Sequence, residues 1–380
     1  HSQAGAGSLV EGNRGLYDEV DARGSYSTAE VAKLLRAPVV LVLDATKVTR
    51  TAAARVLGCQ VLDPEVRIAG VILNQVAGHR HEQVLRDAIE GSCRIPVLGV
   101  VPKAQDNVFP ERHMGLVPHQ ETKNLSRALA FAADSMRDCL DLEALWTIAA
   151  SAQPIGWPLA RSDRNPAGEG RKSVRIGVLR DAAFQFYYPE NLEALEEQGA
   201  SLVEVSSFEE RVLPRVDALY MGGGFPETHL DILGSNHVFR ESLRPATEQG
   251  LPVYAACGGL MVLCRTIEYQ QQRFPMVGVF PFDVVVEEKP QGHGYTVMEC
   301  VRRNPFFEQG GTFKGHEFHY SKVLEWDGAD DELVFTMERG TGLINGKDGV
   351  CRKNVLATYT HIHALGLPVW AKSMILNALA

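Results

Sequence analysis

Runs of consecutive apolar residues alternate with stretches of helical spacing along the first 150 residues. The runs PVVLVLDA (38–45), IAGVILNQV (68–76) and PVLGVVP (96–102) are rich in β-branched residues and predict strands buried on both faces. Helical patterns separate them, at VAKLL, Thr51–Leu57 and HEQVLRDAIE, and a longer one covers 125–149. Strands that alternate with helices in this way predict a doubly wound parallel sheet.

A second α/β pattern begins at VRIGVLRD, after a stretch rich in Pro, Gly and charge. It continues through a helix, the strand SLVEVS and the strand DALYM (217–221). Further on, MVGVFPFDVVVE, GYTVMECV and ELVFTME have the alternation expected of antiparallel strands, with GHEFHYSKV between them. We therefore predict domains at 1–150 and 173–380, joined by a linker at 151–172.

The segment around Cys257 predicts a nucleophile elbow. Val253–Ala256 reads as a buried strand, Gly258 and Gly259 follow the cysteine, and an apolar helical pattern comes next. The turn should be strained, and the position of the thiol at a helix N-terminus should favour the thiolate. The alternative is that Cys257 is a small core residue, but the glycines and histidines described next favour the nucleophile.

Three glycines, Gly222–Gly224, follow the strand 217–221 and could turn peptide N–H groups toward an oxyanion, together with Gly258. Near the C-terminus, TYTHIH reads as a strand that carries His361 and His363 on one face. We choose His361 as the base that takes the thiol proton, with His363 as its orienter or a substrate contact, and the reverse assignment stays open. His316 is read as lying in a glycine-flanked loop, where it binds substrate or has a structural role.

Residues 8–10 should end a short strand, and the acidic Glu11 and Asp18 follow it. Carboxylates just beyond a strand's carboxyl end are placed to hold a magnesium ion, although a solvated loop fits equally well. Ser27 and Thr28 should cap a helix, with Glu30 in its first turn.

Net charge and cysteine content indicate the kind of binding partner and the cellular compartment to expect. A net charge of −9 argues against nucleic acid as the main partner, and no apolar run reaches transmembrane length. Seven scattered cysteines without a CxxC pair suit reduced thiols in the cytoplasm.

These motifs together resemble the cobyrinic acid a,c-diamide synthase family over nearly the whole chain. The resemblance is carried by EGNRGLYD, STAEVAKLL, APVVLVLDA, GVILNQV, YMGGGFPE, AACGGLMVL, GHEFHYS and ATYTHIH. It implies a first domain like the P-loop ATPases related to dethiobiotin synthetase, followed by a class I glutamine amidotransferase-like domain. It also implies a ligase that forms acyl phosphates with ATP on the a and c carboxylates of a corrinoid, in cobalamin biosynthesis. Ammonia from glutamine then displaces the phosphate.

The resemblance also implies residue roles in the first domain. Glu11 would bind Mg²⁺, Asn74 would contact ATP, and Tyr17 and Asp18 would lie near the tetrapyrrole. Ser27 and Thr28 are expected in the same substrate site, and His316 is expected in the substrate site of the second domain. The oligomeric state stays open, with a homodimer as one option.

This sequence departs from the family pattern in three places. It has no P-loop, GxxxxGK[ST], and we expect that some tens of residues precede His1 in the parent protein. The polypeptide alone should then have weak or no ATP-dependent activity, whereas glutaminase activity can survive. His363 stands where many amidotransferases have glutamate, which favours a Cys–His dyad, and Asn13-Arg14 replaces more apolar residues. Alternatives are amidation of nickel sirohydrochlorin, a cobyric acid synthase-like amidase, and a non-catalytic tetrapyrrole-binding remnant.

Overall fold

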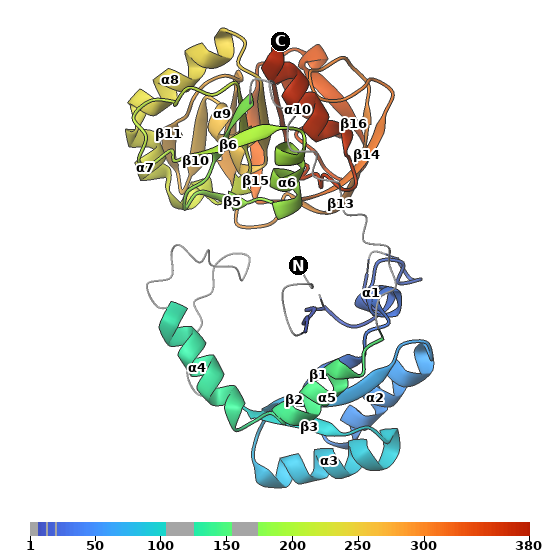
Figure 1. Cartoon of the computed structure of the whole chain (residues 1–380). Helices are drawn as coiled ribbons and strands as arrows, with labels where there is room; N and C mark the ends of the chain where they lie inside the picture. Colours follow the sequence, from blue (N-terminus) through green and yellow to red (C-terminus); the bar gives the residue numbers. More distant parts are fainter. Residues whose placement is uncertain (1–6, 13, 20, 104–124, 154–173) are drawn as a thin grey trace. The chain divides into compact units, whose positions relative to one another are not determined.

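The computed structural model describes residues 7–12, 14–19, 21–103, 125–153 and 174–380. The chain divides into two compact units, His1–Ala160 and Arg161–Ala380 (Figure 1). Each unit has its own sheet and its own hydrophobic core. The domain boundaries expected at 150 and 173 stay a prediction, because residues 154–173 lie outside the described part of the chain.

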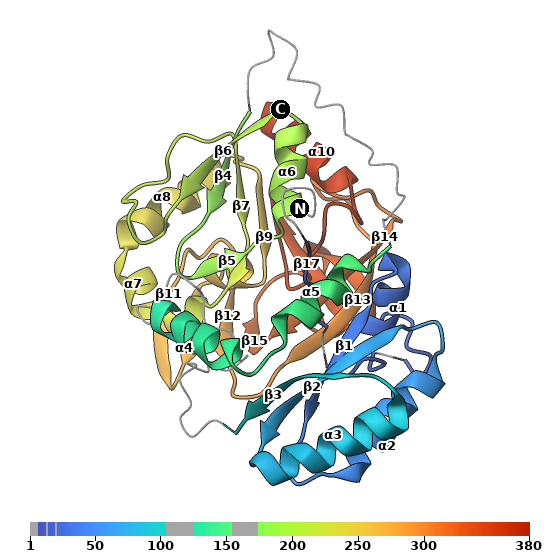
Figure 2. The ribbon, with the colours of Figure 1, turned by 60° about the horizontal axis from the view of Figure 1, so that its bottom comes forward.

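The first unit is built on a three-stranded parallel sheet in the order β1-β2-β3. Helices α2 and α3 pack side by side against one face of it (Figure 2). Apolar residues of these strands and helices form its core, among them Val56, Val71, Leu85 and Ile89. The elements are α1 (Thr28–Leu35), β1 (Val39–Asp44), α2 (Arg50–Leu62), β2 (Ile68–Val76), α3 (His79–Cys93), β3 (Val97–Pro102), α4 (Leu125–Arg137) and α5 (Leu142–Ala150).

Three expectations about the first unit need correction. Residues 8–10 form no strand and Leu9 is fully exposed, since no strand in the described part of the chain pairs with them. The pattern at 125–149 is two helices, because Asp141 caps a new helix by accepting a hydrogen bond from the N–H of Ala144 at 2.9 Å. The helix expected at Thr51–Leu57 is longer, Arg50–Leu62. The helix cap at Ser27 is confirmed, since its hydroxyl accepts the N–H of Glu30.

The second unit is organised around a nine-stranded sheet in the order β14-β13-β16-β17-β18-β9-β7-β4-β6. Strands β18, β9, β7, β4 and β6 are parallel, and the strands from β17 to β14 pair antiparallel, as the change in sequence pattern predicts. A smaller sheet, β11-β10-β12-β15, and the two-stranded pair β5-β8 complete it.

The strands of this unit have the following bounds: β4 (Val174–Leu179), β5 (Phe184–Phe186), β6 (Ala200–Val205), β7 (Ala218–Met221), β8 (Gly223–Gly224), β9 (Val253–Ala256), β10 (Thr266–Tyr269), β11 (Gln272–Pro275), β12 (Phe282–Val286), β13 (Gly292–Cys300), β14 (Thr312–His319), β15 (Ser321–Trp326), β16 (Leu333–Arg339), β17 (Lys347–Arg352) and β18 (Val355–Thr358). The helices are α6 (Pro189–Glu197), α7 (Leu230–Ser235), α8 (His237–Glu248), α9 (Gly258–Leu263) and α10 (Val369–Leu379), with short 3₁₀ turns η2 (Pro226–Thr228) and η3 (Asp330–Glu332).

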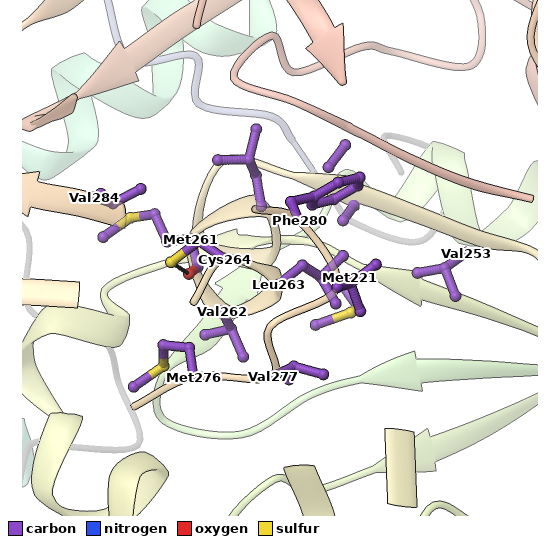
Figure 3. Packing of buried hydrophobic residues seen from close by; sticks show 14 of the residues in the cluster. Met221, Val253, Met261, Val262, Leu263, Cys264, Met276, Val277, Phe280 and Val284 are labelled. Atoms are coloured by element: carbon purple, nitrogen blue, oxygen red, sulfur yellow. Dashed lines mark hydrogen bonds between the residues drawn. The ribbon is translucent and has the colours of Figure 1, made fainter. Parts of the chain in front are cut away.

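The central strands are buried on both faces, because alternate side chains enter two separate cores. In β9, Val253 and Ala255 join the core that contains α9, whereas Tyr254 and Ala256 join the core that contains α10. Figure 3 shows the first core, where Leu263 and Met221 pack together near Val253. The run of apolar residues in β9 thus explains its central position, and the strand delivers Cys257 to the carboxyl edge of the sheet.

Candidate active site

Cys257 lies in a strained turn between β9 and α9. Its backbone has φ 48° and ψ −99°, a combination that residues other than glycine seldom adopt. The turn is held by the N–H of Cys257, which donates to Thr358 O at 2.8 Å, and by its carbonyl, which accepts from the N–H of Met261 at 3.0 Å. The predicted elbow conformation is therefore confirmed.

The electrostatics of the Cys257 thiol contradict the expected thiolate. Cys257 is only 5% exposed, and burial raises its pKa to about 12; the carboxylate of Glu227 adds to this effect. The backbone N–H of Gly258, which follows in the chain, opposes the shift of this pKa. The expectation of a helix-stabilised thiolate is wrong, because α9 is only 6 residues long and burial dominates.

The glycine segment 222–224 supports the Cys257 turn from the neighbouring strand β7. The carbonyl of Gly222 accepts the N–H of Gly259 at 3.1 Å, and Gly223 with Gly224 forms β8. The N–H of Gly222 donates to Tyr187 Oη at 2.8 Å, so this amide is not free for an oxyanion. The amides of Gly223, Gly224 and Gly258 remain candidates for that role.

The imidazole of His361 lies directly against Gly223. A Cβ on Gly223 would overlap Cε1 of the ring and come within 3.3 Å of Nε2, so only glycine leaves room for the imidazole here. Burial lowers the pKa of His361 to about 3, and the neighbouring His316 and His319 add to the effect. At neutral pH the ring is uncharged and able to accept a proton. The Cys257 turn and the His361 ring thus both contact the segment Gly222–Gly224.

The histidine-bearing segment does not continue as a strand. β18 ends at Thr358, and His361 then forms an isolated antiparallel bridge with His316. The two imidazoles stack with centroids 4.9 Å apart and an interplanar angle of 17°. The expected glycine-flanked loop at His316 is also wrong: this residue belongs to β14, which pairs with β13. Long-range strand pairing, not the adjacent glycines, sets its conformation.

His363 has partners other than His361. Its ring packs on Tyr188 with centroids 4.6 Å apart, and its Nε2 lies 3.5 Å from Glu190 Oε2. Tyr188 also reaches His316, with 3.3 Å between Tyr188 Oη and His316 Nδ1. Tyr188 therefore contacts both His363 and His316. The ring that stacks on His361 is that of His316, not that of His363.

Several buried or partly buried polar residues around this site had no place in the predicted set. Tyr187 supports the glycine segment, and Asp348 accepts hydrogen bonds from the residues before His361. Glu317 accepts the N–H groups of Thr341 and Gly342 at 2.5 and 2.9 Å, and lies 3.6 Å from His319 Nε2. The motif GHEFHYS contains two of these residues, but nothing in the local pattern marks Asp348 or Tyr187.

In the first unit, Asn74 lies at the carboxyl end of β2, opposite Asp44 at the end of β1. Its side-chain oxygen accepts the N–H of Gln75 at 2.9 Å, which holds the amide at the sheet edge. Glu11 is exposed, and Asp18 accepts the N–H of Gly15 at 3.2 Å. Asp44 and Asn74 thus lie together at adjacent strand ends, as parallel sheets favour, whereas Glu11 and Asp18 lie in a loop before α1 and follow no strand.

Tyr17, Ser27 and Thr28 have structural contacts of their own. Tyr17 Oη donates to Cys59 O at 2.7 Å, and burial raises its pKa. Ser27 is 1% exposed because it caps α1, and Thr28 begins that helix. Asn13 lies outside the described residues. Within the described ranges, no group of three or more His, Cys, Asp or Glu could hold a metal ion alone. In the same ranges, no helix has the length and apolar character needed to cross a bilayer.

Comparison with known proteins agrees with this arrangement. Residues 175–368 match the CobB/CobQ-like glutamine amidotransferase domain family, and residues 3–111 match an AAA domain family. The cobyrinate a,c-diamide synthase of Magnetococcus marinus is 40% identical over 374 residues, which is 98% of this chain and 80% of that protein. The chain belongs to the cobyrinate a,c-diamide synthase family.

Other cobyrinate a,c-diamide synthases match over similar lengths. That of Methanothermobacter thermautotrophicus is 41% identical over 97% of this chain and 81% of its own length. The family comprises glutamine-hydrolysing carbon–nitrogen ligases, and in this member the amidotransferase domain coincides with the unit that holds Cys257 and His361.

Two solved structures resemble the chain over about half its length. A glutamine amidotransferase crystal structure has a TM-score of 0.40 and 22% identity, and covers 54% of this chain and 99% of that one. The structure of PurLQS from Thermotoga maritima has a TM-score of 0.41 and 16% identity, and covers 55% and 98%.

Proposed function

We propose that this member of the cobyrinate a,c-diamide synthase family amidates the a and c carboxylates of cobyrinic acid, with ATP as activator and glutamine as the nitrogen source. The names of its relatives support this substrate. The observation that carries the glutaminase half is the strained turn at Cys257, which shares the segment Gly222–Gly224 with the neutral imidazole of His361.

In the proposed glutaminase step, Cys257 Sγ attacks the side-chain amide carbon of glutamine. His361 accepts the thiol proton and donates it to the leaving nitrogen, so that ammonia departs and a γ-glutamyl thioester remains. Water then attacks the thioester, glutamate leaves, and the thiol is restored. Because the thiol's pKa is about 12 and that of His361 about 3, both groups are neutral at rest. Proton transfer therefore accompanies the attack instead of preceding it.

Charge develops on the amide oxygen during this attack and needs preorganised donors. The amides of Gly223, Gly224 and Gly258 are the proposed donors, and the Gly222 amide is excluded because it already donates to Tyr187. His316 and His363 would border the glutamine pocket, since Tyr188 joins the two.

In the proposed synthetase step, ATP phosphorylates a carboxylate of the corrinoid, and ammonia displaces the phosphate to give the amide. Asn74 would contact the nucleotide, and Tyr17, Asp18, Ser27 and Thr28 the macrocycle. Glu11 would hold Mg²⁺ together with phosphate oxygens of the nucleotide, because magnesium is usually bound by one or two carboxylates plus substrate phosphates. An exposed carboxylate such as Glu11 suits that mode of binding.

Glutamine hydrolysis tests the first half of this proposal. The unmodified chain should release glutamate and ammonia, and Cys257→Ser and His361→Asn should each lower the rate at least about 100-fold. Intact-protein mass spectrometry should show a glutamyl adduct on the unmodified chain but not on Cys257→Ala. Hydrolysis that survives in Cys257→Ala would refute the assignment.

The macrocycle is tested by an amidation assay with the enzyme. Cobyrinic acid and nickel sirohydrochlorin are offered separately, with ATP, Mg²⁺ and glutamine. Two successive mass changes for amidation should appear with cobyrinic acid. Amidation of nickel sirohydrochlorin alone would overturn the proposed substrate but not the glutaminase site.

A further inference from the structure

Asp348 is a fully buried carboxylate behind the segment that carries His361. It lies in β17 with an exposed fraction of 0%. Its Oδ2 accepts a hydrogen bond from the hydroxyl of Thr358 at 2.7 Å and one from the N–H of Thr360 at 3.3 Å, which this N–H shares with Thr358 Oγ1 at 3.0 Å; its Oδ1 accepts from the N–H of Tyr359 at 3.1 Å. The N–H of Gly349 completes the set at 2.8 Å. Four donors thus converge on one carboxylate.

These hydrogen bonds satisfy buried N–H groups that have no partner in the sheet. β18 ends at Thr358, so the N–H groups of Tyr359 and Thr360 leave the sheet ladder in a fully buried place. Unpaired buried N–H groups cost free energy, and an ionised carboxylate can accept from several donors at once. Burial raises the pKa of Asp348, whereas the hydrogen bonds favour the charged form.

The carboxylate is itself held in one place. Gly349 has φ +70°, and a Cβ there would meet the ring of Phe335, so the Asp348-Gly349 backbone fits only with glycine at this position. Asp348 also pairs with Phe335 across β16 and β17. A rigid strand therefore presents the acceptor to the turn.

The same turn is connected to both proposed catalytic residues. Thr358 O accepts the N–H of Cys257 at 2.8 Å, while Thr358 Oγ1 donates to Asp348. One residue beyond Thr360, the backbone of His361 pairs with His316, with N–O distances of 2.8 and 3.1 Å. Asp348 thus fixes a short segment that contacts the nucleophile at one end and carries the base at the other.

We propose that Asp348 is a positioning residue for glutamine hydrolysis: it holds Thr358–Thr360 in the turn that sets the imidazole of His361 relative to the thiol of Cys257. The inference rests on the proposed glutaminase function. It assigns the orienting role to a carboxylate that acts through the backbone before His361, not to the residue two positions after it.

The variant Asp348→Asn tests this role. It keeps the shape but turns an NH₂ group toward N–H and O–H donors, so the turn should shift. A misplacement of about 1 Å should lower kcat about 100-fold, with KM changed less than about threefold. The pH profile should change as well. With the base misplaced, the reaction depends on thiolate formed by solvent, so kcat/KM should rise about tenfold per pH unit between about pH 7 and 9. The parent should be nearly flat there.

Asp283→Asn is the matched control. Asp283 is also buried, in β12 of the same unit, and accepts hydrogen bonds from Arg265 and Thr266. Its variant can lower the melting temperature, but should leave kcat per folded site and the pH profile as in the parent. A purely structural role for Asp348 predicts that behaviour for Asp348→Asn too. Near-parent kcat and a flat pH profile in folded Asp348→Asn would overturn the proposal.

A second pair of variants decides the matter if Asp348→Asn does not fold. Thr358→Val removes one of the four donors to Asp348 and also the oxygen that accepts the N–H of Thr360 at 3.0 Å, so it should lower kcat about tenfold; Thr358→Ser keeps the hydroxyl and should recover most of that loss. Equal activity of the two variants would contradict the proposal. If the parent itself does not hydrolyse glutamine, or Cys257→Ala still does, the proposed function fails instead.

Discussion

Replacement of Gly223 by alanine is a direct test of where the base lies. The backbone of Gly223 is outside the left-handed region, so alanine itself causes no backbone strain. Its Cβ would, however, overlap Cε1 of His361 and lie 3.3 Å from Nε2 and 3.4 Å from Nδ1. Something has to move, and the imidazole is the group in contact.

The expected loss follows from the displacement that relieves this overlap. A shift of about 1 Å in a catalytic group costs about 100-fold in rate, which corresponds to about 2.7 kcal/mol in the barrier. We expect kcat for glutamine hydrolysis to fall by this factor in Gly223→Ala. Initial rates of glutamate release measure it. Gly234→Ala is the control, because a Cβ at Gly234 in α7 would make only ordinary contacts, at 3.7 Å or more from Phe274.

A stability cycle identifies the group that the methyl meets. Overpacking should destabilise Gly223→Ala by about 1–3 kcal/mol in urea unfolding. In a His361→Ala background the ring is gone, so the same methyl should cost little. Activity within threefold of the parent, or the same destabilisation in both backgrounds, would refute the placement of His361 against Gly223.

Four further outcomes follow from burial. Iodoacetamide should modify Cys257 slowly at pH 7 and about tenfold faster with each pH unit above it, because burial raises the pKa of the thiol to about 12. Peptide mass spectrometry measures the rate of modification, and a rate that levels off below pH 9 would contradict this prediction. The Cε1 proton of His361 should show no NMR titration between pH 5 and 8, since its pKa is about 3. In the unfolded chain the imidazole of His361 takes up a proton near pH 6.5, whereas in the folded chain it stays neutral down to about pH 3. The free energy of unfolding should therefore fall as the pH drops from 6.5 toward 3. Urea unfolding of the parent and of His361→Asn at several pH values tests this. Trp370→Ala should cost about 3–5 kcal/mol of unfolding free energy, because the indole is fully buried against α6 and the sheet; a loss below 1 kcal/mol would be inconsistent with that packing.

Local signals predicted the elements that local chemistry determines. The strand Val253–Ala256, the turn at Cys257 and the helix after it follow from a short apolar run and two glycines, and the structure has them at those residues. The cap at Ser27 is equally local. His316 could not be placed in this way, because its conformation depends on the pairing of β14 with β13 and on the bridge to His361.

The misjudged chemistry has the same origin. The thiol of Cys257 was expected to be acidic because a helix begins there, but residues distant in sequence bury it and outweigh that helix. Asp348 was missed because Asp-Gly between two strands looks like an ordinary turn, and its four donors come together only in the folded sheet. The sequence thus indicates which helix or strand a residue belongs to. How far that residue is shielded from water depends on the packing of the whole core.

The buried, neutral pair has a consequence for how hydrolysis is controlled. Burial raises the pKa of Cys257 to about 12 and lowers that of His361 to about 3, so forming the thiolate–imidazolium pair in the empty site is unfavourable. Bound glutamine should reduce this cost, because in the proposed attack the charge develops on its carbonyl oxygen, beside the amides of Gly223, Gly224 and Gly258, and not on an isolated sulfur. A thiol arranged in this way should react slowly with other electrophiles until glutamine is bound, which suits the proposed use of its ammonia in a second reaction.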